Sequence, residues 1–227
     1  MCGIVGLHLR DPELYSRFGA LLAAMLIEMT DRGPDSAGIA VYSDEKGLAI
    51  HKGIGLPAAI ARDCGLASAS GWQGLGHTRM ATESAVTVAG CHPFSVGPDQ
   101  CLVHNGSFAN HATIRRDLRD AGVTFDSEND SEVGARFVAH RLAQGDDLHK
   151  ALTGLREAFD GFYTLLVTSG DGFAVVRDAI ACKPAVIAET SRWVAMASEY
   201  RALVGLPGIE SATIFEPEPE KVYAWTR

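Results

Sequence analysis

The chain opens on a short apolar run, Gly3-Ile4-Val5-Gly6-Leu7, which follows directly behind Met1 and Cys2. This run lacks the polar alternation of a half-exposed strand and is typical of a strand that is buried on both faces. We therefore predict that the chain enters a sheet with its first residues and that Cys2 stands at the edge of this sheet.

Cys2 is the first candidate for chemistry. Removal of Met1 would leave a residue that carries both a thiol and a free α-amine, which are a nucleophile and a base beside it. The amine has a reference pKa of roughly 7.7–8.0, so a useful fraction is unprotonated near neutral pH. Considered alone, however, the position favours a buried and inert thiol, because a small residue at position 2 merely permits the removal of Met1.

Length and charge limit the class of protein. The 227 residues suffice for one large domain, which we expect to span residues 2–227 and to bury roughly 70–75% of the unfolded chain's surface. The net charge is −8 and the acidic groups are scattered, so neither nucleic acid nor an anionic membrane is expected as a partner. No apolar run approaches the roughly 20 residues of a membrane span, and no basic leader precedes the first strand. We expect a cytoplasmic protein.

The cysteine pattern argues against a structural metal or a disulfide framework. The chain has five cysteines, and none forms a Cys-x-x-Cys pair. We therefore expect no metal and no cofactor in this chain. The cysteines other than Cys2 are interpreted as small core residues; they are Cys64, Cys91, Cys101 and Cys182.

Hydrophobic periodicity predicts an α+β chain whose strands and helices come in blocks. Strands are expected near residues 3–7, 39–42, 48–51, 75–79, 101–104, 162–168, 173–177, 185–188, 193–197 and 222–225. Helices are expected near residues 12–29, 58–63, 111–121, 131–144, 149–159 and 199–203. This order favours layers of sheets and helices over a regular alternation of strand and helix.

Four polar segments interrupt the apolar strands and form the candidate site. They are Arg32-Gly33-Pro34-Asp35-Ser36-Ala37-Gly38, Gly76-His77-Thr78-Arg79-Met80-Ala81-Thr82, His104-Asn105-Gly106 and Asp130-Ser131-Glu132. Each has a structural explanation of its own. In chain order these are a helix-to-strand turn, a solvated or paired arginine, an Asn-Gly hairpin turn and a helix N-cap.

Each segment also has a functional interpretation. The Arg79 guanidinium can clamp a carboxylate with two parallel hydrogen bonds. The Asn105 amide and the Gly106 backbone N–H can form an oxyanion hole. The Asp130 carboxylate can hold an ammonium group. Together with Cys2, these groups describe an α-amino acid with a side-chain acyl group to be attacked, and glutamine meets that description.

This ordered set of segments resembles the class II glutamine amidotransferases of the N-terminal-nucleophile hydrolase superfamily. The four polar segments match in the family's order, together with Cys2-Gly3-Ile4-Val5-Gly6 and His92-Pro93-Phe94. A weaker match is Ala197-Ser198-Glu199. The resemblance covers essentially the whole chain and implies a four-layer αββα sandwich, in which two packed antiparallel sheets are flanked by helices.

The resemblance also implies catalytic roles. Cys2 is the implied nucleophile, and its amine is the implied base and later the acid for the departing ammonia. Asn105 and Gly106 are implied to stabilise the tetrahedral oxyanion. The reaction passes through a γ-glutamyl thioester on Cys2, which water hydrolyses to glutamate. Met80 stands where the family often has an aromatic residue, and methionine can still pack against the stem of the ligand.

Substrate binding is implied for a second group of residues. Arg79 binds the glutamine α-carboxylate, with support from Thr82 and His92. Asp130 holds the α-ammonium group. Arg32 belongs to a motif that shapes the site and takes no part in the chemistry.

The released ammonia implies an acceptor. Family members usually carry a synthase domain on the same chain, whereas this chain ends at Arg227, so we expect the acceptor site on a separate polypeptide. The compact length and residues 29–38 are most similar to stand-alone amidotransferase subunits of glutamate-synthase-like assemblies, including N-methylglutamate synthase. In such assemblies a flavin and iron–sulfur subunit performs the acceptor chemistry.

Two other functions stay open from the sequence. An N-terminal-cysteine amide hydrolase, acting on acylated amines such as conjugated bile acids or penicillin-like amides, would share Cys2 and the fold. It would not need Arg79 and Asp130 arranged for a free amino acid. A non-catalytic regulatory subunit would merely keep the fold, and the intact set of site residues argues against it.

Overall fold

The first strand, β1 (Gly3–Leu9), has all seven of its residues buried, as its apolar sequence predicts. The computed structural model describes residues 1–80, 86–97 and 99–227. Thr82 falls outside this range, so its role stays a prediction. The described chain forms two compact units, which we call unit 1 (Met1–Pro93 and Pro184–Glu216) and unit 2 (Phe94–Lys183 and Pro217–Arg227). The single domain expected over residues 2–227 likewise stays a prediction.

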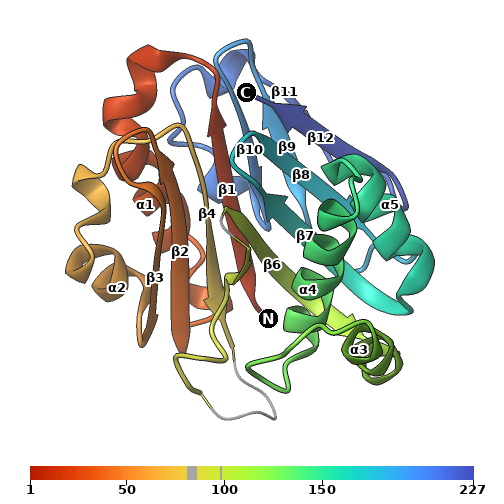
Figure 1. The fold of residues 1–227 in the computed structure, drawn as a ribbon. Coiled ribbons are helices and arrows are strands. Elements are labelled where there is room, and N and C mark those ends of the chain that lie inside the picture. The colour runs from red at the N-terminus through yellow and green to blue at the C-terminus, as the bar shows by residue number, and fades with distance from the viewer. Residues whose placement is uncertain (81–85, 98) are drawn as a thin grey trace. The chain divides into compact units, whose positions relative to one another are not determined.

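Unit 1 is built on an antiparallel sheet whose described strands have the order β11-β9-β10-β1-β4-β2-β3. The other strands are β2 (Ser36–Ser43), β3 (Gly47–Ile54), β4 (Gln73–Arg79), β9 (Val186–Glu189), β10 (Trp193–Ala197) and β11 (Thr213–Phe215). Helix α1 (Phe18–Ile27) packs against β1 and β4, and α2 (Pro57–Asp63) packs against β2 and β3, as Figure 1 shows. Short 3₁₀ helices complete the unit: η1 (Pro12–Arg17), η2 (Thr30–Arg32), η3 (Leu66–Ser68), η4 (Tyr200–Ala202) and η5 (Ile209–Ser211).

The core of unit 1 lies between α1 and the sheet. Phe18, Leu22 and Leu26 recur at helical spacing along α1 and are fully buried in one cluster with Val5 and Leu7 of β1. Burial of each such side chain is worth about 1.5–3 kcal/mol relative to exposure. This packing holds β1 in the middle of its sheet, and the strand in turn fixes where residue 2 stands.

Unit 2 is built on a second antiparallel sheet, and its described strands have the order β12-β8-β7-β6-β5. The strands are β5 (Phe94–Val96), β6 (Gln100–Phe108), β7 (Gly161–Thr168), β8 (Gly172–Arg177) and β12 (Val222–Thr226). The helices are α3 (His111–Asp120), α4 (Asp130–Ala143) and α5 (Leu148–Ala158). Helix α4 lies along β5 and β6, whereas α5 lies along β8 and β12 (Figure 1). A separate apolar cluster fills this unit, with Phe108, Val138, Leu152, Leu155 and Leu165 at its centre.

The α+β class and the two antiparallel sheets are confirmed, but some local predictions are wrong. The single helix expected over 12–29 is two pieces, because Pro12 opens a 3₁₀ helix and α1 begins only at Phe18. The Asp11 carboxylate caps the first piece by accepting a 2.9 Å hydrogen bond from the Glu13 N–H. The strands β5 and β11 have three residues each and were too short for any periodicity to predict.

The cysteines divide differently from the prediction. Cys91 and Cys101 are buried, as expected for small core residues, but Cys182 is exposed and Cys64 is half-buried. Burial is the main cause that raises the pKa of the Cys64 thiol above its ordinary value. None of the five cysteines, all of which the structure describes, forms a disulfide bond. No helix within the described residues has the length and apolar character of a membrane span.

Candidate active site

Three of the sequence motifs meet at one end of the sheet of unit 1. Strand β1 pairs with β4 so that Gly3, the residue after Cys2, stands opposite Thr78, the residue before Arg79 at the end of β4. On the other side of β4, Ser36 of β2 stands opposite Arg79. The antiparallel register therefore brings the candidate nucleophile, the candidate carboxylate clamp and the Arg32–Gly38 motif to the same end of the sheet.

Side chains hold the backbone directly behind Cys2. The ladder between β1 and β10 begins only at Val5, so the three residues before it extend past this neighbour. Ser198 takes over here, since its hydroxyl accepts a 2.9 Å hydrogen bond from the Ile4 N–H and its own N–H donates to the Ile4 carbonyl at 2.9 Å. Arg32 Nε donates to the Cys2 carbonyl at 2.9 Å. The residue that carries the thiol is thus anchored through its own carbonyl.

Arg32 reaches this position because of the turn that follows it. Its side chain is buried and its Nη1 lies 2.8 Å from a carboxylate oxygen of Glu199. The turn lies against β4, and a Cβ on Gly33 would stand 2.6 Å from the backbone of Arg79. Only glycine permits this approach. The Asp35 N–H then donates to the Arg79 carbonyl at 3.1 Å, which joins the motif to the end of β4.

The predicted carboxylate-binding residues of unit 1 are buried side chains. Arg79 is 8% exposed and His92 is 6% exposed. The His92 ring stacks on the ring of His77 with a centroid distance of 4.0 Å and an interplanar angle of 28°. Because residues 77 and 79 are two apart on one strand, their side chains share a face of β4. His92 therefore rests on the strand face that also carries Arg79.

The N-terminus is accessible. Met1 is 59% exposed, and its amine lies 3.1 Å from the sulfur of Met80, which is itself 39% exposed. With Met1 in place, the nitrogen of Cys2 belongs to a peptide bond and cannot act as a base. The predicted catalytic amine exists only after Met1 has been removed.

In unit 2, the motif His104-Asn105-Gly106 lies inside β6, so its interpretation as a hairpin turn is wrong. Asn105 pairs with Thr164 of β7 and is buried. Gly106 has a φ of +150°, and a Cβ there would clash with the Phe162 carbonyl oxygen of the neighbouring strand. Close approach of two backbones, and not a tight turn, is the reason for glycine at this position.

Asp130 is the first residue of α4, but it is not the cap of this helix. The N-cap is Asn129, whose side chain accepts a 2.9 Å hydrogen bond from the Ser131 N–H. The Asp130 carboxylate instead accepts a 2.9 Å hydrogen bond from the Phe108 N–H at the end of β6. The capping explanation given to this segment thus applies to Asn129, and Asp130 serves to join α4 to the strand that carries Asn105.

His104 is a functional candidate that the sequence did not single out. Its Nδ1 shares a 2.9 Å hydrogen bond with the Ser131 hydroxyl and lies 3.9 Å from Oδ2 of Asp130, and its ring stacks on Phe108 with centroids 4.3 Å apart. Burial lowers its pKa to about 4; the Asp130 carboxylate opposes this shift and the positive charge of Lys183 adds to it. The ring is therefore neutral near pH 7 and leaves the charge of Asp130, a side chain 23% exposed, unneutralised.

The structure brings the predicted residues together in two groups. In unit 1, Cys2, Arg32, Arg79 and His92 gather around one end of the sheet. In unit 2, the end of β6 and the start of α4 unite Asn105, Gly106 and Asp130. The positions of His104, Ser198 and Glu199 were not predicted, although each stands beside or within a motif that was. Among the described residues, no group of His, Cys, Asp and Glu side chains is arranged to hold a metal ion.

Comparisons with known proteins agree with this arrangement. A family model described as a glutamine amidotransferase domain matches residues 63–218. The glutamine amidotransferase-like protein GlxB of Rhizobium meliloti (strain 1021) is 44% identical over 99% of this chain and 98% of its own length. The chain belongs to the class II glutamine amidotransferase family.

Solved structures support the fold. The glutamine phosphoribosylpyrophosphate amidotransferase from B. subtilis matches 99% of this chain and 49% of its own, with a TM-score of 0.72 and 23% identity. A glutamine aminotransferase class-II domain protein from Silicibacter pomeroyi matches 98% of this chain and 94% of its own, with a TM-score of 0.60 and 17% identity. The predicted fold of the N-terminal-nucleophile hydrolase type is thereby confirmed.

Titration of His104 should appear in the pH dependence of stability. The folded chain holds the ring neutral down to about pH 4, whereas in the unfolded chain the ring binds a proton below about pH 6.5. The unfolded state therefore binds more protons within this window, and the free energy of unfolding falls as the pH decreases from 6.5 to 4. We expect His104→Gln to remove a loss on the order of 2 kcal/mol, measured by urea unfolding at both pH values. If the free energy of unfolding of the variant had the same pH dependence as that of the wild type, His104 would not be the group that causes the loss.

Proposed function

We propose that this chain hydrolyses glutamine to glutamate and ammonia, with Cys2 as nucleophile after removal of Met1. The observation that carries the proposal is the β1–β4 register, which sets Gly3 opposite Thr78 and so brings their neighbours Cys2 and Arg79 to the same end of a buried sheet. A thiol with its own α-amine and a guanidinium that binds an amino-acid carboxylate together suit a substrate such as glutamine. The exposure of Met1 supports the processing step.

The proposed reaction uses the residues of unit 1 to bind and attack. The Cys2 amine takes the thiol proton, and the thiolate adds to the side-chain amide carbon of glutamine. Arg79 holds the α-carboxylate, with Thr82 and His92 beside it. The amine then returns the proton to the departing ammonia, and a γ-glutamyl thioester remains on Cys2. A water molecule completes the cycle and releases glutamate.

The residues of unit 2 supply charge stabilisation in the same proposal. The Asn105 amide and the Gly106 N–H donate to the oxyanion of the tetrahedral intermediate, and loss of one such donor costs roughly 10²–10³ in kcat. Asp130 holds the α-ammonium group. Its suitability follows from the neutral His104, because this ring carries no positive charge that would compete with the cationic group of a ligand for the carboxylate.

We further propose that the ammonia passes to a separate synthase subunit of a glutamate-synthase-like assembly, such as N-methylglutamate synthase, in the cytoplasm. The acceptor chemistry then belongs to a partner with flavin and iron–sulfur groups. In support, this chain covers 98% of GlxB, whereas it covers 49% of the B. subtilis amidotransferase. Reconstitution with candidate partner subunits, read out as glutamine-dependent product formation, tests this step.

Cys2→Ala should abolish ammonia release from glutamine, because it removes the attacking sulfur and leaves a side chain that fits the same space. The measurement is glutamate formation by protein whose N-terminus has been verified by mass spectrometry. Cys182→Ala is the matched control, since it removes an exposed thiol and should keep full activity. Wild-type turnover by Cys2→Ala would overturn the nucleophile assignment. Turnover of acylated amines in place of glutamine would instead favour the amide hydrolase.

Asp130→Asn should raise the KM for glutamine roughly 10- to 100-fold, because a hydrogen bond to a charged group is worth about 1.5–3 kcal/mol. The asparagine oxygen can still accept from the Phe108 N–H, so the thermal midpoint should change little. The control is Asp126→Asn, which neutralises a carboxylate that is 87% exposed and paired with Arg136. An unchanged KM in Asp130→Asn would leave this residue a purely structural role.

A further inference from the structure

We propose that Glu199 is a positioning residue for the nucleophile, because its carboxylate orients Arg32, the residue that donates a hydrogen bond to the Cys2 carbonyl. This inference rests on the proposed function, since it takes Cys2 as the attacking group. Glu199 does not touch the thiol; it acts through Arg32. The two residues are separated by 167 positions in the sequence, so no local motif relates them.

Arg32 is held by hydrogen bonds on two of its three side-chain nitrogens. Its Nε donates to the Cys2 carbonyl at 2.9 Å, and its Nη1 lies 2.8 Å from Oε1 of Glu199. Its Nη2 is buried and, within the described residues, has no hydrogen-bond partner. The guanidinium is planar and rigid, so two anchored nitrogens fix its plane. Loss of the Glu199 charge would leave the buried guanidinium without the carboxylate that now pairs with it.

Glu199 is itself held in place by its neighbour in the chain. It follows Ser198, whose N–H and hydroxyl both bind Ile4 of β1. The carboxylate therefore projects from a backbone that is bonded to the same strand as Cys2. Through Arg32, the chain closes a ring of contacts that begins and ends on residues 2–4. A ring of this kind restricts movement of the carbonyl more than a single hydrogen bond would.

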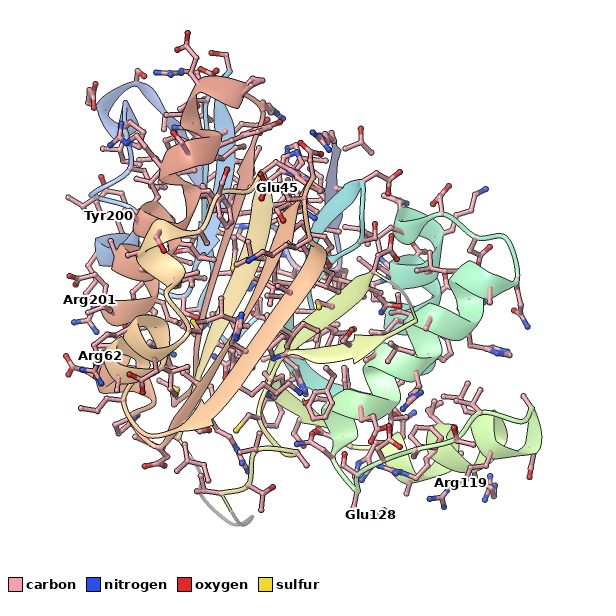
Figure 2. The ribbon with its side chains drawn as sticks, turned by 60° about the vertical axis from the view of Figure 1, so that its left-hand side comes forward. Glu45, Arg62, Arg119, Glu128, Tyr200 and Arg201 are labelled. Atoms are coloured by element: carbon pink, nitrogen blue, oxygen red, sulfur yellow. The ribbon has the colours of Figure 1, made fainter. Side chains whose placement is uncertain are left out.

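On its outer side, Glu199 pairs with a second arginine. Its Oε2 lies 2.8 Å from Nε of Arg201, whose Nη1 lies 3.3 Å from Asp31, the residue before Arg32. Figure 2 shows the Arg201 side chain at the surface; together with α1 it lines a groove of about 380 Å³. Arg201 is 41% exposed, so water and salt weaken its pairing and its contribution is the smaller of the two.

The expected consequence is a loss of rate without a loss of substrate affinity. The Glu199–Arg32 pair acts on the backbone of Cys2 and makes no contact that we assign to glutamine. The KM for glutamine should therefore stay close to the wild-type value. A displacement of a reacting group by about 1 Å can cost 10²-fold in rate. We expect Glu199→Gln, which keeps the shape and removes the charge, to lower kcat roughly 10- to 100-fold.

The test compares Glu199→Gln with Glu189→Gln in steady-state glutamine hydrolysis and in thermal unfolding. Glu189 is a matched control, because it lies in the same unit at the end of β9, pairs with Arg10 at 2.7 Å and is 32% exposed, against 34% for Glu199. We expect similar unfolding midpoints for the two variants and a fall in kcat for Glu199→Gln alone. Equal kcat values in the two variants would overturn the inference.

A second variant and a second readout keep the outcome decisive. Arg201→Met should lower kcat severalfold, in the same direction as Glu199→Gln, and it serves if the latter does not fold. The rate of Cys2 alkylation by iodoacetamide, followed by mass spectrometry of the N-terminal peptide, needs no glutamine and should fall in both variants while that of Cys182 stays constant. Unchanged kcat values and alkylation rates in Glu199→Gln and Arg201→Met would contradict the positioning role of Glu199. The proposed function of the chain would still stand. Full activity of Cys2→Ala would instead remove the proposed function itself.

Discussion

The backbone of residues 2–4 at the end of a buried strand is the feature on which the rest of the account depends. A nucleophile needs a fixed position, and chain termini are ordinarily the least ordered parts of a protein. Here the apolar strand β1 lies between β4 and β10, and Ser198 and Arg32 bind the backbone where the β10 ladder stops. The terminus is thus held by the sheet up to the residue that carries the thiol.

In unit 2 as well, contacts that hold the structure together involve residues of the candidate site. Asp130 accepts a hydrogen bond from the backbone at the end of β6, and the buried His104 beside it is neutral and adds no positive charge. The low pKa of His104 costs stability at acidic pH, which is the expected cost of burying an ionisable ring. A structural network that fixes a helix to a strand can therefore also prepare a charge for a ligand.

The sequence predicted much of this architecture and missed what depends on distant contacts. The order of strands and helices followed from periodicity, and the motifs around Cys2, Arg79 and Asp130 followed from resemblance. Asn105-Gly106 has the signature of a hairpin turn, but β6 continues through it, and the glycine is explained by the close approach of the Phe162 carbonyl. The ion pair between Arg32 and Glu199 could not be predicted either, because the two residues are far apart in the sequence.

The most direct test of the central claim is covalent labelling with the glutamine analogue 6-diazo-5-oxo-norleucine, followed by peptide mass spectrometry of all five cysteines. The account predicts one adduct, on the sulfur of an N-terminal Cys2 that has lost Met1, and protection of this residue by excess glutamine. Labelling of Cys64 or Cys182 with Cys2 left unmodified, or retention of Met1 in fully active protein, would contradict it.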